Sequence, residues 1–287
     1  MFSILAHEIS EKKYLTTKSR KSKLHKRHFI LTSGRCGSNY LANTLNLNAE
    51  VVNYGEVLGH WTLLKKIHKP LFSLGGLSKE RYLDMLYKQS TYFYLAQCYS
   101  AYSHLRKKQP VNWKSRYNTK SVGIKDFFVN VKQDNLYNYF LDSKEISIIH
   151  LKRSNILKRL ISAMLMHQAG VVSTTENSTE NKSFEIDIDQ LLAKLKRDYE
   201  LNEEENAFAA KLSKKQPFYQ LSYEDYFSSP ESTSKHNSQI FDFLGVESTQ
   251  VKSKHRKVLS QNLADIITNY DDIERALKAT KFEQYLY

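Results

Sequence analysis

A glycine-rich run near the beginning of the chain holds the residues best suited to bind an anion. Residues 32–41 read TSGRCGSNYL; they follow an apolar run, HFIL, and lead into a helical pattern from Leu41. Glycines allow successive backbone N–H groups to converge, and the N-terminus of a helix adds positive potential at the same point. Arg35 adds a fixed charge, and Ser38 adds a hydroxyl and a suitable N-cap. The run therefore predicts a site for a phosphate or a group of similar shape.

This run differs from the Walker A loop of nucleotide hydrolases. That loop requires a lysine directly after its second glycine, followed by a serine or threonine. Here Gly37 is followed by Ser38, and the cation, Arg35, comes before the glycine. Without the paired lysine and hydroxyl, hydrolysis of a nucleoside triphosphate loses its main charge-neutralising groups. The spacing thus indicates an anion site of another kind.

A second pair of candidate residues lies at a later junction of a strand and a helix. Residues 145–151 read EISIIHL, and such a β-branched, apolar run predicts a buried strand. Arg153 stands just beyond this strand, and Ser162 lies nine residues later in a helical pattern. Taken singly, Arg153 could cap the sheet edge and Ser162 could be an ordinary buried serine.

Together the two motifs resemble those of the sulfotransferases that use 3′-phosphoadenosine 5′-phosphosulfate (PAPS), in their bacterial-type, carbohydrate-sulfotransferase-like form. T-x-G-R-x-G-S-x-x-L is similar to the 5′-phosphosulfate loop of that family, and H-L-K-R-x-N-x-L-x-x-x-x-S is similar to its 3′-phosphate segment. Weaker similarity lies at 221–226 (LSYEDY), at 240–246 (IFDFLGV) and in the C-terminal tail. The resemblance implies an enzyme that transfers a sulfuryl group from PAPS without a metal ion.

The resemblance also assigns residues to the cofactor. It implies that the 5′-phosphosulfate is held by six residues of the loop, Arg35, Cys36, Gly37, Ser38, Asn39 and Tyr40. Arg153 and Ser162 would hold the 3′-phosphate, the group that distinguishes PAPS from ATP. Arg256 and Lys257 are further candidates for the phosphates, although the chain lacks the R-K-G pattern of the cytosolic animal enzymes. We interpret Cys36 itself as a small, space-filling residue, because no histidine partner is evident.

The elements around these residues predict one common site. Candidate strands at 28–32, 51–54, 121–124, 146–151 and 218–221 alternate with helical patterns. This alternation favours an α/β domain with a largely parallel sheet, and the resemblance implies a P-loop-like fold of three layers. Arg35, Glu56, Lys125 and Arg153 each follow one of these strands by one to three residues. Because ligands of such sheets bind beyond the carboxyl ends of the strands, we expect the four side chains to meet at one edge.

Direct, in-line sulfuryl transfer needs a base for the acceptor proton and positive charge near the moving group. Glu56 is our candidate base, because carbohydrate-acting members of the family have a glutamate in this region. It could instead be an exposed loop residue or a partner of Arg35. His60 is the second candidate base. Lys125 could stabilise the bridging oxygen or the leaving phosphate, or simply be a surface lysine.

Composition sets the remaining expectations. The chain has 287 residues and a net charge of +13. We expect a basic, flexible segment at 1–27, which either attracts anions or is merely solvated, and one sulfotransferase domain at 28–287 with a helical insertion at about 57–120.

The stretch 78–105 reads as one long helix whose six tyrosines pack rather than stack on sugars, and 173–183 reads as a polar loop, either disordered or a lid over the acceptor. No apolar run approaches the roughly 20 residues of a membrane span, and two cysteines make no disulfide framework, so the sequence predicts a cytoplasmic protein.

The sequence thus predicts sulfuryl transfer from PAPS to a hydroxyl of a small-molecule or glycan acceptor, with a carbohydrate or glycolipid favoured. Two alternatives stay open. One is a small-molecule kinase with a degenerate phosphate loop. The other is a non-enzymatic protein that binds polyanions or nucleic acid, although basic charge without a recognisable nucleic-acid fold is weak support. Neither the identity of the acceptor nor the oligomeric state follows from the sequence.

Overall fold

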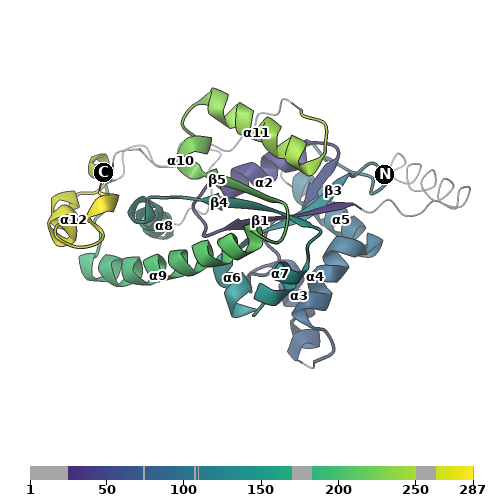
Figure 1. Ribbon diagram of the computed structural model, residues 1–287, viewed down its shortest axis with the longest axis horizontal. Helices are drawn as coiled ribbons and strands as arrows, with labels where there is room; N and C mark the ends of the chain where they lie inside the picture. The colour runs from purple at the N-terminus through teal and green to yellow at the C-terminus, as the bar shows by residue number, and fades with distance from the viewer. Residues whose placement is uncertain are drawn as a thin grey trace, which may run out of the picture.

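A parallel β-sheet forms the centre of the computed structural model, which describes residues 25–286 except 74, 107, 109, 170–182 and 250–262. Within these ranges the sheet has five strands in the order β2-β3-β1-β4-β5, and every neighbouring pair is parallel (Figure 1). The strands are β1 (Lys26–Thr32), β2 (Val51–Asn53), β3 (Ser121–Phe127), β4 (Ile146–Lys152) and β5 (Phe218–Ser222). The expected α/β class with a central parallel sheet is confirmed.

Two strands are longer than the sequence predicts. β1 begins at Lys26, whose ammonium donates to the Phe243 carbonyl, and the next residue, Arg27, forms an ion pair with Glu145 at 2.5 Å. The basic segment expected at 1–27 therefore ends in a strand, and residues 1–24 lie outside the described residues. β3 continues to Phe127, because its pairing with β1 extends that far. Lys125 thus lies within β3, and the expectation that it follows the strand is wrong.

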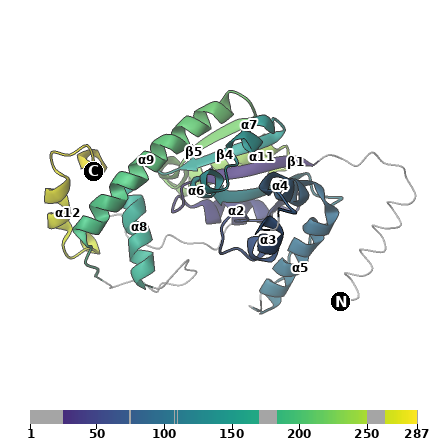
Figure 2. The same ribbon diagram turned by 90° about the horizontal axis from the view of Figure 1, so that it is seen from below.

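Helices cover both faces of the sheet and make the three layers (Figures 1 and 2). The main helices are α2 (Ser38–Leu47), α3 (Leu63–Ser73), α4 (Lys79–Lys88), α5 (Ser90–Arg106), α6 (Phe128–Gln133), α7 (Tyr137–Asp142), α8 (Ile156–Ala169), α9 (Ile188–Ser213), α10 (Tyr223–Tyr226), α11 (Pro230–Leu244) and α12 (Tyr270–Leu277). In both views α8 and α12 lie at one end of the molecule, and α3, α4 and α5 gather toward the other.

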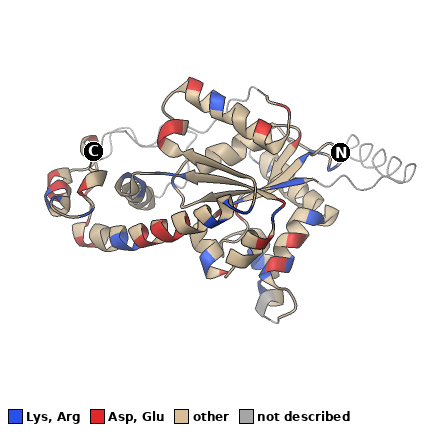
Figure 3. Ribbon diagram, viewed as in Figure 1, with Lys and Arg blue, Asp and Glu red and all other residues tan. Residues whose placement is uncertain are grey.

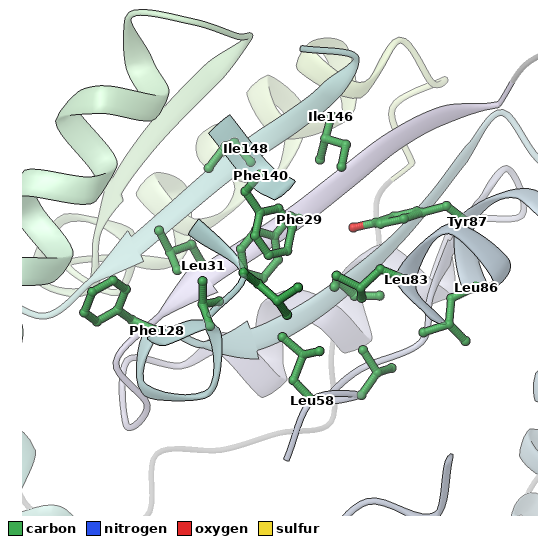
Figure 4. Close-up of a cluster of buried hydrophobic side chains, with 14 of the residues drawn as sticks. Phe29, Leu31, Leu58, Leu83, Leu86, Tyr87, Phe128, Phe140, Ile146 and Ile148 are labelled. Carbon is green, nitrogen blue, oxygen red and sulfur yellow. The ribbon is translucent and has the colours of Figure 1, made fainter. Parts of the chain in front are cut away.

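The core follows from the alternation of side chains along the strands. Phe29 and Leu31 of β1 face the layer of α4, α6, α7 and α9, and the Phe29 ring stacks on Phe140 of α7 at 4.3 Å (Figure 4). Ile30, between them, faces α2 and α11 on the other side, where it packs with Leu41. A further core joins α8, the beginning of α9 and α12. Burial on both faces explains why β1 and β4 read as continuous apolar runs.

Three helices lie between β2 and β3, in the region of the expected insertion. The single long helix expected at 78–105 is wrong, because the extended backbone of Gln89 separates α4 from α5. Its tyrosines do not share one environment: Tyr82 and Tyr87 are buried, whereas Tyr99 and Tyr102 are exposed. Within the described residues, we find no helix with the length and apolar character needed to cross a bilayer.

Candidate active site

The glycine-rich loop after β1 forms a concave arrangement of backbone groups. Gly34, Arg35 and Gly37 have positive φ angles of +84°, +52° and +77°, and Cys36 separates the first two of these residues from the third. Such a sequence of conformations turns successive N–H groups toward one point and creates an anion-binding nest. Gly37 is also the N-cap of α2, and the first turn of the helix contains no acidic residue. The positive end of α2 therefore faces the same point.

Two aromatic rings enclose this loop. A Cβ atom at Gly37 would lie 2.4 Å from the Phe227 ring, and one at Gly34 would lie 3.2 Å from the Phe127 ring. Tyr40 also packs edge-on against Phe227, with 5.3 Å between the ring centroids. Two features therefore favour glycine at position 37: the left-handed backbone and the close approach of the Phe227 ring.

Arg35 and Arg153 bring two positive charges to the loop. Arg153 donates to the Arg35 carbonyl at 3.3 Å, and its guanidinium lies over the Tyr223 ring at 4.4 Å. The Arg35 Nε is buried and has no hydrogen-bond partner among the described residues. Burial lowers the pKa of Arg35, and the charge of Arg153 lowers it further. In the part of the chain that the structure describes, neither arginine forms an ion pair with a carboxylate, so an anionic ligand would relieve this repulsion.

The other residues assigned to the cofactor are placed differently. The N-cap expected at Ser38 is wrong, because Gly37 takes that position and Ser38 is the first residue of α2, followed by the exposed Asn39. Cys36 is fully buried and its thiol donates to the Gly34 carbonyl at 2.9 Å; burial raises its pKa to about 11. Ser162 is buried on α8, the helix that follows Arg153, nine residues further along the chain. The candidates Arg256 and Lys257, and residues 173–182 of the expected polar loop, lie outside the described residues.

Beneath the loop, a buried polar network fastens it to α8 and α9. The Ser33 hydroxyl donates to Glu205 of α9, whose second oxygen lies 3.0 Å from the His150 Nε2. Arg159 of α8 donates to the Ser33 carbonyl at 3.1 Å and to Asp198 at 3.0 Å. Sequence reasoning missed this network, because Ser33 and Glu205 are 172 residues apart and no local pattern links them.

Glu56 and Lys125 form an ion pair at the neighbouring strands. Glu56 accepts a hydrogen bond from the Lys125 ammonium with one oxygen and from the Trp61 indole N–H with the other, at 2.8 Å. Lys125 is only 2% exposed, and its ammonium also lies 4.8 Å from the centre of the Phe127 ring. The carboxylate is therefore held from both sides by donors, and Lys125 rather than Arg35 is its partner.

The backbone just after Glu56 is fixed by the buried Asp126. Its carboxylate accepts from the N–H groups of Val57 at 2.8 Å and Leu58 at 2.6 Å, and from the side chain of Asn130 at 2.6 Å. Burial raises the pKa of Asp126, while these hydrogen bonds favour its charged form. Asp126 therefore positions the segment that carries Glu56, a role that its place beside Lys125 in the sequence did not reveal.

Trp61, which sequence reasoning did not single out, takes the place beside the candidate base. His60 is exposed and packs edge-on against the Trp61 ring at 4.9 Å, whereas Trp61 itself bonds Glu56. The indole is 44% exposed and lies 6.1 Å from the Phe127 ring. No periodic pattern marks residues 54–62, which is why only the ionisable Glu56 and His60 were candidates there.

The candidate residues share the carboxyl edge of the sheet. Glu56 follows β2, Lys125 lies near the end of β3, and Arg35 follows β1, whereas Arg153 follows β4 and Tyr223 follows β5. The Phe127 ring connects the two halves, because it touches the position of Gly34 on one side and lies under Lys125 on the other. The arrangement offers an anion site on one side and an oriented carboxylate on the other.

Comparison with known proteins gives structural but no sequence matches. No protein-family model matches the chain, and no curated protein matches it. A sulfotransferase from Alicyclobacillus acidocaldarius shares 14% identity with a TM-score of 0.44, over 92% of this chain and 99% of that chain. The sulfotransferase domain from the curacin biosynthetic pathway shares 14% identity with a TM-score of 0.45, over 89% of this chain and 98% of that chain. Retinol dehydratase in complex with retinol and PAP shares 14% identity with a TM-score of 0.38, over 91% of this chain and 84% of that chain.

Proposed function

We propose that the protein is a sulfotransferase that moves a sulfuryl group from PAPS to a hydroxyl acceptor. One observation carries this proposal: Arg35 and Arg153 meet beside the positive end of α2 without a carboxylate partner among the described residues. PAPS carries two separate anionic groups, the 5′-phosphosulfate and the 3′-phosphate. The site offers a separate source of positive potential for each of them, the backbone nest of the loop and the arginine after β4.

Particular residues would hold each part of such a ligand. The backbone N–H groups of Gly37 to Tyr40 would hold the 5′-phosphosulfate, supported by the helix dipole of α2. Arg35 has a buried, unpartnered Nε within the described structure and can supply a further hydrogen bond. Arg153, stacked on Tyr223, would hold the 3′-phosphate together with Ser162 of α8. The guanidinium fork suits the geometry of a phosphate group.

Glu56 would act as the general base. It takes the proton of the acceptor hydroxyl while the hydroxyl oxygen bonds to sulfur and the bond from sulfur to the bridging oxygen breaks, giving a sulfate ester and adenosine 3′,5′-bisphosphate. When Glu56 becomes neutral, the ammonium of Lys125 loses its compensating charge. Lys125 can then stabilise the negative charge that develops on the departing phosphate. The ion pair thus links removal of the proton to stabilisation of the leaving group.

We further propose that the acceptor hydroxyl belongs to a carbohydrate or a glycolipid. The half-exposed Trp61 indole is held beside Glu56 by the hydrogen bond between them. An aromatic ring fixed next to the base provides a flat apolar surface with a polar end, which suits the mixed character of a sugar ring. The hydroxyl to be modified would then lie within reach of the carboxylate.

Thermal unfolding with nucleotides tests the proposal. Adenosine 3′,5′-bisphosphate at about 100 times its dissociation constant should stabilise the protein by roughly 2.7 kcal/mol, or about 5 °C for a chain of this size. The 2′,5′-isomer and magnesium-ATP should have little effect. The Arg153→Ala variant should lose the response, whereas the control Arg275→Ala, an exposed arginine on α12, should keep it. A preference for magnesium-ATP would contradict the proposal and favour a kinase, and no response to any nucleotide would favour a binding protein.

A further inference from the structure

Exposed apolar side chains are concentrated in one part of the molecule. Among the described residues, eleven large hydrophobic side chains are exposed, and ten of them lie between residues 57 and 120. These residues form the helical insertion between β2 and β3, which we call the α3–α5 insertion. Single exposed hydrophobic residues are normal on any protein, but their accumulation on one segment indicates an interaction surface.

On two helices of the insertion, these side chains form stripes. Leu63, Ile67 and Leu71 follow one another at intervals of four residues along α3, and Leu95, Tyr99 and Tyr102 line one face of α5. All six are between 48% and 65% exposed. Residues spaced by three or four share a face of a helix, so each stripe is continuous. The two helices are joined by a hydrogen bond between His68 and Tyr92 at 2.6 Å.

The same segment carries most of the excess positive charge. Residues 57–120 contain twelve Lys and Arg against two Asp and Glu, in a chain whose net charge is +13. The two acids, Glu80 and Asp84, belong to α4, so α3 and α5 contain none. Many of the other acidic residues lie on α9, α11 and α12 (Figure 3). The insertion is thus apolar at its surface and rich in basic residues, of which Lys114 is buried and Lys65 pairs with Asp134 of the neighbouring segment.

We propose that the α3–α5 insertion binds the surface of an anionic lipid bilayer. Apolar stripes of this kind enter the boundary between headgroups and acyl chains, while lysines beside them reach anionic headgroups. Trp61, Tyr99 and Tyr102 are of the types that collect at membrane interfaces. A second copy of the chain would present an equally basic face and be repelled, and a nucleic acid would leave the aliphatic stripes without a partner.

The α3–α5 insertion lies next to the proposed acceptor side of the candidate active site, and this position indicates where the acceptor would come from. Trp61 stands two residues before Leu63, the first residue of the α3 stripe, and bonds the carboxylate of Glu56. A bilayer bound to α3 would therefore lie next to the acceptor side of the candidate active site. The acceptor would then be the headgroup of an amphiphile in that bilayer. This second step rests on the proposed function, whereas binding of the bilayer does not.

Sedimentation with lipid vesicles tests the proposal on the full chain. The protein should bind vesicles of phosphatidylcholine with phosphatidylglycerol, bind pure phosphatidylcholine weakly, and lose affinity at high salt. A double variant, Leu63→Gln with Ile67→Gln, should bind about tenfold or more weakly, because two apolar side chains no longer enter the bilayer. The matched control is Leu47→Gln on α2, which removes a leucine of similar exposure, 43%, outside the insertion and should bind like the wild type.

Three outcomes would overturn this assignment. Equal vesicle binding by the double variant and the control would show that the stripe is not the docking surface. A dimer in sedimentation equilibrium that the double variant abolishes would assign the face to a second copy. Absence of vesicle binding, with unchanged binding to a polyanion such as heparin in both variants, would assign the charge to another ligand. The response to adenosine 3′,5′-bisphosphate, measured in the same variants, reports separately on the proposed function.

Discussion

The site has two halves that differ in their charge. The first half holds an ion pair, and the second holds positive charge without a negative partner among the described residues. Glu56 and Lys125 neutralise each other, and the Trp61 indole completes the hydrogen bonds of the carboxylate. Arg35 and Arg153 lie together without a carboxylate partner in the described ranges. Positive charge held in place before a ligand arrives needs little reorganisation on binding, so the second half is prepared for an anion. The first half holds the carboxylate of Glu56, the proposed base, in a fixed orientation.

Glu56→Gln tests the role of this carboxylate. The amide keeps the size of the side chain and can still accept from the Trp61 indole, but it cannot take a proton. We expect kcat for sulfuryl transfer to fall about 10²- to 10⁴-fold, the usual range for loss of a general base. The affinity for adenosine 3′,5′-bisphosphate should stay near that of the wild type. Steady-state kinetics and nucleotide titration measure the two effects.

Trp61→Phe is the matched control. It keeps an aromatic ring beside Glu56 and removes the indole N–H group, so the carboxylate that we propose as the base is kept with one donor fewer. We expect a much smaller loss of kcat than for Glu56→Gln. Full activity of Glu56→Gln would mean that Glu56 serves only as the partner of Lys125, and His60 would become the next base to test.

The strands and the glycine loop after β1 could be predicted from the sequence because their signals are local. A buried parallel strand reads as a continuous apolar run, as at 28–31 and 146–151, and a left-handed turn favours glycine, as at Gly34 and Gly37. The break at Gln89 has no proline or glycine to mark it, whereas Pro70 lies inside α3. The pairing of Glu56 with Lys125 and of Ser33 with Glu205 could not be predicted, because the partners are 69 and 172 residues apart and meet only through packing.

Gly37→Ala tests how the loop is held between its rings. The substitution places a side chain in a left-handed conformation, at about 1–2 kcal/mol, and drives its Cβ against Phe227 at the N-terminus of α2. Gly245→Ala, at the C-cap of α11, has a similar φ of +67° and open space around the added Cβ. We expect urea unfolding to show a larger loss of stability for Gly37→Ala than for Gly245→Ala. Only the first should weaken binding of adenosine 3′,5′-bisphosphate.

A second substitution separates the cost of the left-handed conformation from the cost of the contact with Phe227. Combining Gly37→Ala with Phe227→Leu removes the ring that the new Cβ meets, so the two changes should be less destabilising together than the sum of each alone. Equal losses for Gly37→Ala and Gly245→Ala would mean that Phe227 moves aside without cost. The close approach of the ring would then have no part in requiring glycine at position 37.

A buried histidine joins three strands of the sheet by hydrogen bonds, and the proposed chemistry does not use it. His28 of β1 is fully buried, with its Nδ1 2.8 Å from the Ser121 hydroxyl and its Nε2 3.0 Å from the Asn53 amide nitrogen. It packs so closely on Gly123 that a Cβ atom there would lie 2.2 Å from the ring. Burial lowers the pKa of His28 to about 3, so the folded protein keeps this histidine neutral. Nε2 then accepts from Asn53, and Nδ1–H donates to Ser121.

The stability of the protein should therefore fall in mild acid. The unfolded chain binds a proton at a histidine pKa near 6.5, whereas folded His28 binds one only near pH 3. The contribution of His28 is complete above pH 6.5 and is lost as the pH falls toward 3, with about 2 kcal/mol lost by pH 5. His28→Gln keeps one donor and one acceptor but does not titrate, so urea unfolding at pH 7.5 and pH 5 should show a smaller loss for this variant. The raised pKa of Asp126 acts in the opposite direction but is common to both proteins, and equal losses would mean that protonation of His28 does not govern stability in this range.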